Sequence, residues 1–260
     1  MCILFIAIEQ HPDYPLIIAA NRDEFYQRPT QQAHIWHGPD GIYAGKDNQQ
    51  GGTWLGINQR GEFAALTNIR EQERHRDDAT SRGELVVKAL AGDINHDWLL
   101  AHSDEYNPFN LVYQHQHTLY CYNSIDKTQT MIDEGFHAIC NGHMDDVWPK
   151  MARGEQALET LVRQAKQQRL NIDKHALLAL LKDPEQAPDY LLPDTGVGID
   201  WERTLSSVFI QSSFYGTRSS AIVLKKNDNS FEFFEQSYNS QGSVTETTNV
   251  FLNQQGQYEF

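Results

Sequence analysis

The chain has 260 residues, of which 40% are apolar, enough to bury a substantial core without disulfides or a structural metal. Its 35 acidic residues outnumber its 21 Lys and Arg, and a net charge of −14 argues against nucleic acid or an anionic membrane as a partner, since both bind basic surfaces. Three cysteines suit a reducing compartment, and no apolar stretch approaches the roughly 20 residues that span a bilayer, so we expect a cytoplasmic protein without membrane insertion.

Apolar runs bounded by turn residues predict a series of strands, most of them joined as hairpins. They cover residues 2–8, 15–20, 52–58, 62–68, 109–114, 117–123, 207–211, 221–225 and 231–235. Because the first run is apolar at nearly every position, we expect it to be covered on both faces in the centre of a sheet. The succession of hairpins favours an antiparallel arrangement.

Helical segments are predicted between these groups of strands. Ser81 and Glu84 have the spacing of a capping box before an apolar stripe. A longer apolar face predicts a helix over residues 145–169, and Asp173 is expected to cap a shorter helix that follows. No segment has the composition of a linker, so residues 1–260 are expected to form a single α+β domain.

Cys2 is the first residue with catalytic potential. If Met1 is removed, Cys2 carries both a thiol and a free α-amine, and the amine can accept the thiol proton, so that one residue supplies nucleophile and base. A retained Met1 would block that amine. The alternative is that Cys2 is only a small buried side chain in the first strand, as free cysteines commonly are.

Four polar residues, Asn21-Arg22-Asp23-Glu24, follow the second apolar run directly. Strand alternation would place Asn21 and Asp23 on one face and Arg22 on the other. The alternative is a solvated strand end that holds an internal ion pair.

Three further residues are candidates for chemistry. Asn68 ends a predicted strand, where its amide could be offered to an oxyanion. His115 and His117 alternate along one predicted strand face and have metal-binding side chains. An exposed edge strand accounts for the two histidines better, so we expect no resident metal.

Further sequence blocks run in order through almost the whole chain: Met1-Cys2-Ile3, Leu16-Ile17-Ile18-Ala19-Ala20, Arg28-Pro29, Leu66-Thr67-Asn68, Ser81-Arg82-Gly83-Glu84-Leu85, Phe109-Asn110-Leu111, Asn141, Trp148-Pro149-Lys150 and Tyr215-Gly216-Thr217-Arg218. Together with the intact residues 21–24, these blocks resemble the NRDE family, also called the transport and Golgi organisation 2 family. Such an ordered set is highly specific.

The resemblance implies a branch of the N-terminal nucleophile hydrolases, whose fold is a four-layer αββα sandwich of two antiparallel sheets between helices. It implies that Cys2 is the nucleophile and that Asp23 contacts its amine. Asn68 and Asn141 would help to hold an oxyanion, and Arg218 would orient the site. These five residues are therefore expected to converge on one cleft.

One departure concerns the cation beside the nucleophile. Sequences of the cholylglycine-hydrolase type resemble this chain near the second strand, but carry an arginine where this chain has Ala20. Arg22 falls in a variable slot of that pattern. Since a neighbouring cation stabilises a thiolate, we expect a less reactive thiol.

The resemblance also implies haem trafficking, and lipid or acyl-CoA handling besides. We therefore expect a haem-binding and haem-transfer protein with haem-donating or haem-accepting partners, its cargo held non-covalently because no Cys-x-x-Cys-His motif occurs. The haem propionates need a local cation on this acidic protein, and Arg22 and Arg218 are the expected sources. The alternatives are a Cys2-dependent amidohydrolase or acyltransferase, and an acyl-CoA or lipid-binding protein.

Overall fold

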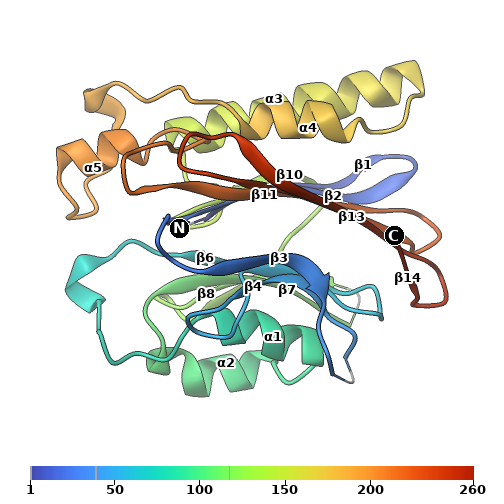
Figure 1. The fold of residues 1–260 in the computed structure, drawn as a ribbon, viewed down its shortest axis with the longest axis horizontal. Coiled ribbons are helices and arrows are strands. Elements are labelled where there is room, and N and C mark those ends of the chain that lie inside the picture. Colours follow the sequence, from blue (N-terminus) through green and yellow to red (C-terminus); the bar gives the residue numbers. More distant parts are fainter. Residues whose placement is uncertain (1, 39, 117) are drawn as a thin grey trace. The chain divides into compact units, whose positions relative to one another are not determined.

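The computed structural model describes residues 2–38, 40–116 and 118–260, which form a mixed α+β fold (Figure 1). The chain divides into two compact units, each assembled from separate stretches of sequence. Unit 1 contains Met1–Gln27, Asp133–Cys140 and Met144–Phe260, and unit 2 contains Arg28–Ile132 and Asn141–His143. Each unit is built on one seven-stranded antiparallel sheet. The expectation of a single domain stays a prediction.

The sheet of unit 1 contains the apolar first strand of the chain, which lies next to an edge strand. In spatial order its strands are β10 (Gly135–Ile139), β1 (Cys2–His11), β2 (Tyr14–Phe25), β11 (Tyr215–Lys225), β12 (Phe231–Tyr238), β13 (Val244–Leu252) and β14 (Tyr258–Glu259). Because β1 pairs with β10 on one side and with β2 on the other, the prediction that the first strand is not on an edge is confirmed, although it is the second strand of seven rather than the central one.

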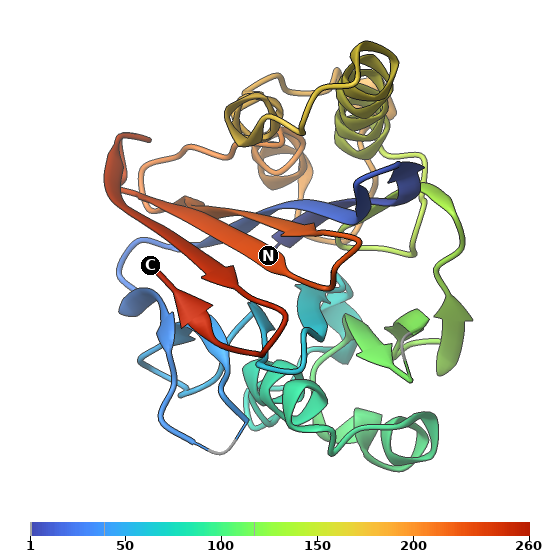
Figure 2. The same ribbon diagram turned by 90° about the vertical axis from the view of Figure 1, so that its right-hand side faces the viewer.

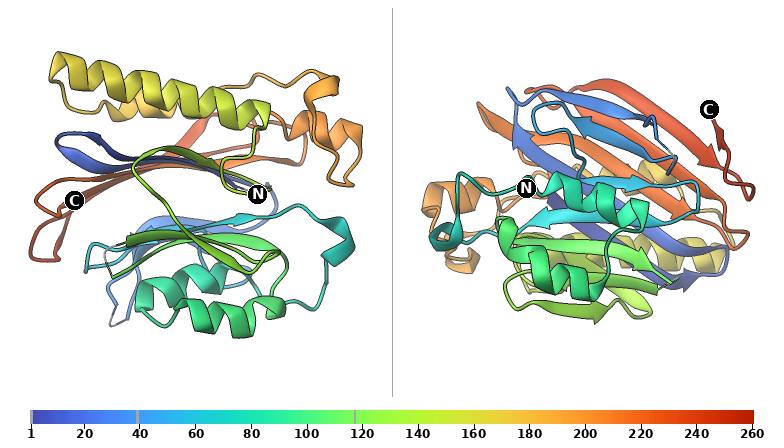
Figure 3. Two further views of the ribbon diagram at one scale, coloured as in Figure 1. Left: turned by 180° about the vertical axis from the view of Figure 1, so that it is seen from behind. Right: turned by 90° about the horizontal axis from the view of Figure 1, so that it is seen from below.

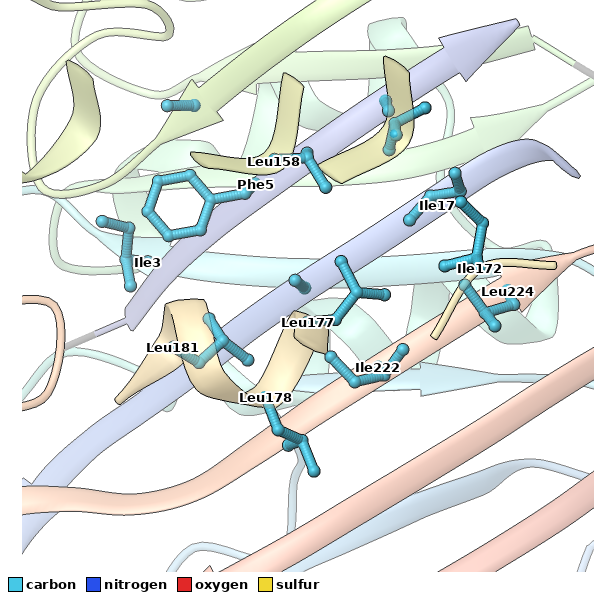
Figure 4. Close-up of a cluster of buried hydrophobic side chains, with 14 of the residues drawn as sticks. Ile3, Phe5, Ile17, Leu158, Ile172, Leu177, Leu178, Leu181, Ile222 and Leu224 are labelled. Atoms are coloured by element: carbon cyan, nitrogen blue, oxygen red, sulfur yellow. The ribbon is translucent and has the colours of Figure 1, made fainter. Parts of the chain in front are cut away.

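Helices α3 (Pro149–Gln168) and α4 (Lys174–Leu181) cover one face of this sheet (Figure 2), while α5 (Ile199–Thr204) lies nearer its end (Figure 1). Leu158 of α3 packs over Phe5 of β1, and the leucines of α4 pack over β2 and β11 (Figure 4). Asp173 caps α4 as predicted, accepting a hydrogen bond from the His175 amide at 2.8 Å. This apolar layer fixes β1 and β2, which carry the candidate site.

The sheet of unit 2 is likewise covered by helices. In spatial order its strands are β3 (Thr30–Ile35), β4 (Tyr43–Asp47), β5 (Leu55–Ile57), β6 (Phe63–Asn68), β7 (Phe109–His115), β8 (Thr118–Asn123) and β9 (Thr128–Met131). Helices α1 (Gly83–Ala91) and α2 (His96–His102) lie on the same side of it (Figure 3). Each unit thus pairs one sheet with one helical layer, the elements that the αββα expectation requires.

Six strands of the structure were not predicted from the sequence: β3, β4, β9, β10, β13 and β14. All of them lie at or next to the edge of a sheet. Most are poorly buried, and β9, for example, has no fully buried residue. Peripheral strands therefore lack the apolar pattern on which strand prediction depends.

The predicted strand at residues 207–211 is wrong, because local hydrogen bonds hold this segment in bends. The Ser207 hydroxyl donates to the carbonyl of Phe209, and the Phe209 amide donates to the carbonyl of Asp183. Ile210 pairs instead with Thr217, through both the backbone and the threonine hydroxyl.

Two predicted helix starts are also wrong. The Ser81–Glu84 capping box does not form, because the Glu84 carboxylate accepts a hydrogen bond from the Tyr106 hydroxyl and α1 has no side-chain cap. The long helix begins at Pro149 rather than at Asp145, whose carboxylate accepts the backbone amide of Ala138 at 3.0 Å. Within the described ranges, no helix is long and apolar enough to cross a membrane.

The contact between α3 and β1 gives a stability prediction. Gly154→Ala is expected to lower the free energy of unfolding by about 1–3 kcal/mol, because its methyl group would overlap the fully buried ring of Phe5. In an exposed helix the same change stabilises by roughly 0.5–1 kcal/mol, so the sign is diagnostic. Urea unfolding measures it, with Gln156→Ala on the exposed face of α3 as the control. A Gly154→Ala protein more stable than the wild type would contradict the packing described.

Candidate functional site

The four polar residues 21–24 lie inside β2, between β1 and β11. Asn21 and Asp23 point to the helical layer, and Arg22 points to the opposite face, as alternation along a strand predicts. The solvated strand end is wrong, since Asn21 is fully buried and Asp23 is 2% exposed. Burying such groups is costly unless each is hydrogen-bonded, so their partners indicate their roles.

Asn21 connects the sheet by hydrogen bonds to the end of α4 and to the segment before β11. Its side-chain amide donates to the carbonyls of Leu181 and Val208 at 2.8 and 3.0 Å. Its side-chain oxygen accepts the Ser220 hydroxyl at 2.6 Å, and that hydroxyl oxygen accepts from Tyr238 at 3.1 Å. Since all these atoms are buried, the amide of Asn21 serves the fold and holds the end of α4 and the segment before β11 in place.

Asp23 is the second buried polar group on this face. Its carboxylate accepts the Thr217 hydroxyl at 2.7 Å. Burial raises its pKa, an effect that the positive charge of Lys150 partly offsets. Lys150 is itself buried in the first turn of α3, where its Nζ donates to the carbonyl of Leu205 at 2.8 Å.

Lys150 was not singled out for a role from the sequence. A signal was nevertheless present, because Lys150, Gly154 and Leu158 follow one another at intervals of four residues. This spacing places Lys150 on the apolar face of its own helix. A lysine at such a position needs a buried partner, and the carbonyl of Leu205 and the charge of Asp23 supply it.

Cys2 lies on the other face of the sheet. It is 6% exposed, and burial raises the pKa of its thiol to about 11, although the charge of Arg22 acts in the opposite direction. Cys140 donates its thiol hydrogen to the carbonyl of Cys2 at 3.4 Å. The thiol of Cys2 is therefore protonated at neutral pH in this environment.

The expected loss of a cation beside the thiol is wrong. Arg22 stands directly opposite Cys2 in the pairing of β1 with β2, and Ala20 stands opposite Leu4. Since residues two apart on a strand share a face, an arginine at position 22 occupies the same face as one at position 20 would. The structure thus retains a guanidinium next to Cys2.

Arg218 is brought to the same end of the sheet by an irregularity. The pairing of β11 with β2 shifts between Thr217 and Ser219, which leaves Arg218 as the extra residue of a β-bulge. Its guanidinium donates to the carbonyls of Phe25 and Tyr26 at 3.0 and 3.2 Å. Burial lowers the pKa of Arg218, and the positive charge of Arg22 lowers it further. Arg218 therefore lies within electrostatic reach of Arg22 on the neighbouring strand.

Asn68 and Asn141 belong to unit 2, and there they meet. The Asn141 side-chain amide donates to the backbone carbonyl of Asn68 at 2.8 Å, and the Arg70 amide donates to the carbonyl of Asn141. Asn110, which was noted only within a sequence block, is fully buried and donates to the carbonyl of Gly142 at 2.7 Å. The sequence indicated this contact, because Asn110 is a polar residue between Phe109 and Leu111 in an apolar strand and needs a buried partner.

The structure thus gathers Cys2, Arg22, Asp23 and Arg218 at one end of the unit 1 sheet, and Asn68 with Asn141 in unit 2. The convergence of all of them on one cleft stays a prediction. His117 lies outside the described residues. Within the part of the chain that the structure describes, no group of three or more His, Cys, Asp or Glu side chains is placed to hold a metal ion.

Comparisons with known proteins agree on one family. The family described as "Transport and Golgi organisation 2" matches residues 1–240. The chain is 34% identical to the "Transport and Golgi organization protein 2 homolog" of Homo sapiens, covering 91% of this chain and 93% of that protein. It is 33% identical to the homolog of Bos taurus with the same coverage, and 28% identical to the Drosophila melanogaster protein, covering 91% and 92%.

Among solved structures, a mutant conjugated bile acid hydrolase from Clostridium perfringens matches with a TM-score of 0.53. The match covers 100% of this chain and 96% of that one at 8% sequence identity. At this identity the likeness shows the fold alone. It confirms the expected N-terminal nucleophile hydrolase-like fold class.

The hydrogen bonds of Asn21 give a prediction that separates structural from functional residues. Asn21→Ala should lower the free energy of unfolding by about 2–4 kcal/mol, because two buried carbonyls lose their donor. Ser220→Ala removes one hydroxyl that bonds both Asn21 and Tyr238 and should cost about 1–2 kcal/mol. Urea unfolding followed by circular dichroism measures both. Equal stability of Asn21→Ala and wild type would contradict the structural role.

Proposed function

Because the chain belongs to the Transport and Golgi organisation 2 family, as its sequence blocks predicted, we propose that it is a cytosolic haem-binding and haem-transfer protein on an N-terminal nucleophile hydrolase-like fold. In this proposal haem is cargo, bound reversibly and passed between donor and acceptor proteins. The residues that hold its propionates are Arg22 and Arg218.

The pairing of these two arginines is the observation that carries the proposal. The charge of Arg22 acts on Arg218, and the carboxylate of Glu24 lies 3.8 Å from Arg22. Like charges held together on a sheet destabilise each other, and groups perturbed in this way are common at functional sites. A bound anion would relieve the repulsion.

The two arginines contrast with the acidic character of the whole chain. A net charge of −14 repels a dicarboxylate such as haem from most of the protein. Two guanidinium groups at one end of β2 and β11 offset that repulsion locally, and guanidinium binds carboxylate through paired hydrogen bonds. A carrier must also release its cargo, which suits ionic anchors rather than a covalent bond.

The proposal predicts the outcome of a haem titration followed at the Soret band. Wild-type protein should bind haem saturably, and Arg22→Gln and Arg218→Gln should each weaken binding by about 5- to 20-fold through loss of charge-assisted hydrogen bonds. Arg163→Gln, an exposed arginine on α3 that pairs with Glu159, is the matched control and should bind as tightly as wild type.

Haem dimethyl ester adds a control on the ligand side. It lacks the propionate charges, so its binding should be weaker and equally weak in wild type and in both arginine variants. No saturable spectral change with wild type would defeat the carrier proposal. Equal haem affinity of wild type and both variants would remove the arginines from it.

A second function is favoured by the position of Arg22 opposite Cys2. A cation there stabilises a thiolate, which an amidohydrolase or acyltransferase with Cys2 as nucleophile would need. A protein of the same fold is named as a conjugated bile acid hydrolase. Removal of Met1 would add the α-amine that this chemistry uses as its base.

This second function predicts turnover that depends on Cys2. With Met1 removed, as verified by intact mass, the protein should cleave members of a panel of acyl amides, and Cys2→Ala should lower the rate by about 10³-fold or more. Cys121→Ala, a buried cysteine of unit 2, should cleave like wild type. Retention of Met1, or cleavage that survives in Cys2→Ala, would rule this function out.

A further inference from the structure

One end of the unit 1 sheet carries an aromatic surface made of Phe25, Trp201, Phe214 and Tyr215. Phe25 and Phe214 stack with their ring planes 13° apart and their centroids 6.2 Å apart. Trp201 meets Phe214 and Tyr215 edge-on, at centroid distances of 5.6 and 5.7 Å. Tyr215 is buried beneath the others, whereas Phe25 and Phe214 are 49% and 50% exposed. The rings of Phe25 and Phe214 are therefore half exposed to solvent, and Tyr215 packs beneath them.

The elements that carry these rings hold them in place. Phe25 ends β2 and pairs with Tyr215, the first residue of β11. The Tyr26 amide donates to the carbonyl of Phe214 at 3.0 Å, which fixes the turn before β11. Trp201 comes from α5, close to the start of β11 (Figure 1). A surface fixed in this way loses little entropy when a ligand binds.

The aromatic surface is bordered by positive charge. Arg218 donates to the carbonyl of Phe25, so its guanidinium lies against the backbone of one of the exposed rings. Arg22 lies next to Arg218 on the neighbouring strand. On the other side, Arg203 of α5 bridges Asp189 and Asp200 at 2.9 and 2.8 Å, so its charge is already paired with carboxylates.

Contiguous exposed aromatic side chains mark binding sites more often than single ones do. Stacking on open aromatic faces recognises a flat ring, and guanidinium recognises a carboxylate. A flat aromatic molecule with carboxylates on one edge would satisfy both features together. An aliphatic acyl chain would make apolar contact with these side chains but could not stack on their rings.

We infer that the aromatic surface is the ring-binding part of the haem site, with the porphyrin stacked on Phe25 and Phe214 and a propionate reaching Arg218. This inference rests on the proposed haem-carrier function and adds to it the residues that bind the macrocycle. It assigns ring recognition and charge recognition to different side chains. The two are therefore separable by experiment.

The test compares three probes: haem, metal-free protoporphyrin IX and haem dimethyl ester. Phe25→Leu and Phe214→Leu keep apolar volume but remove the ring, and each should weaken binding of all three probes by about 3- to 10-fold. Phe214→Tyr keeps the ring and should bind like wild type. Arg218→Gln should weaken only the two probes that carry propionates. Unchanged thermal unfolding verifies that the variants fold.

Phe251→Leu is the matched control. Phe251 is 39% exposed on β13, where it pairs with Glu232 and Glu259 at the opposite end of the sheet, so its loss should change no affinity. If wild type binds porphyrin and both leucine variants bind it equally well, the inference is overturned while the carrier function stands. If wild type binds none of the three probes, the carrier function and the inference both fail.

Discussion

β2 carries four consecutive polar residues through the interior of a seven-stranded sheet, and the two-residue period of a strand assigns them alternately to its two faces. On the helical face Asn21 and Asp23 bind groups within the protein. On the other face Arg22 stands opposite Cys2. Because β2 is paired along both edges, neither set can move without disturbing β1 and β11. The site is therefore as rigid as the core beneath it.

Burial and neighbouring charges both shift pKa values at this end of the sheet. Burial raises the pKa of the Cys2 thiol to about 11, and the nearby guanidinium of Arg22 reduces that effect without reversing it. Burial also lowers the pKa of Arg218, and the charge of Arg22 adds to this. A protonated thiol beside Arg22, with the charge of Arg22 acting on Arg218 in turn, is an environment suited to binding an anion. The same residues would need the α-amine of Cys2 to become a nucleophilic centre.

The β-bulge at Arg218 links the polar site to the aromatic surface. Arg218 is the extra residue of this bulge, and its guanidinium donates to the carbonyls of Phe25 and Tyr26. The same end of β11 begins with Tyr215, which supports the exposed rings. The same end of the sheet thus holds a cation and an aromatic surface.

The sequence by itself determined the family, the α+β class, the interior position of β1 and the alternation of residues 21–24, because these depend on continuous apolar runs and on local period. It did not determine the outer strands β3, β4, β9, β10, β13 and β14, whose exposed faces lack an apolar pattern. Nor did it determine that Arg22 faces Cys2, that Lys150 is buried near Asp23, or that Phe25 stacks on Phe214. Register, a bulge and contacts between residues more than 100 positions apart decide these features, and no local pattern encodes them, so only the tertiary structure could.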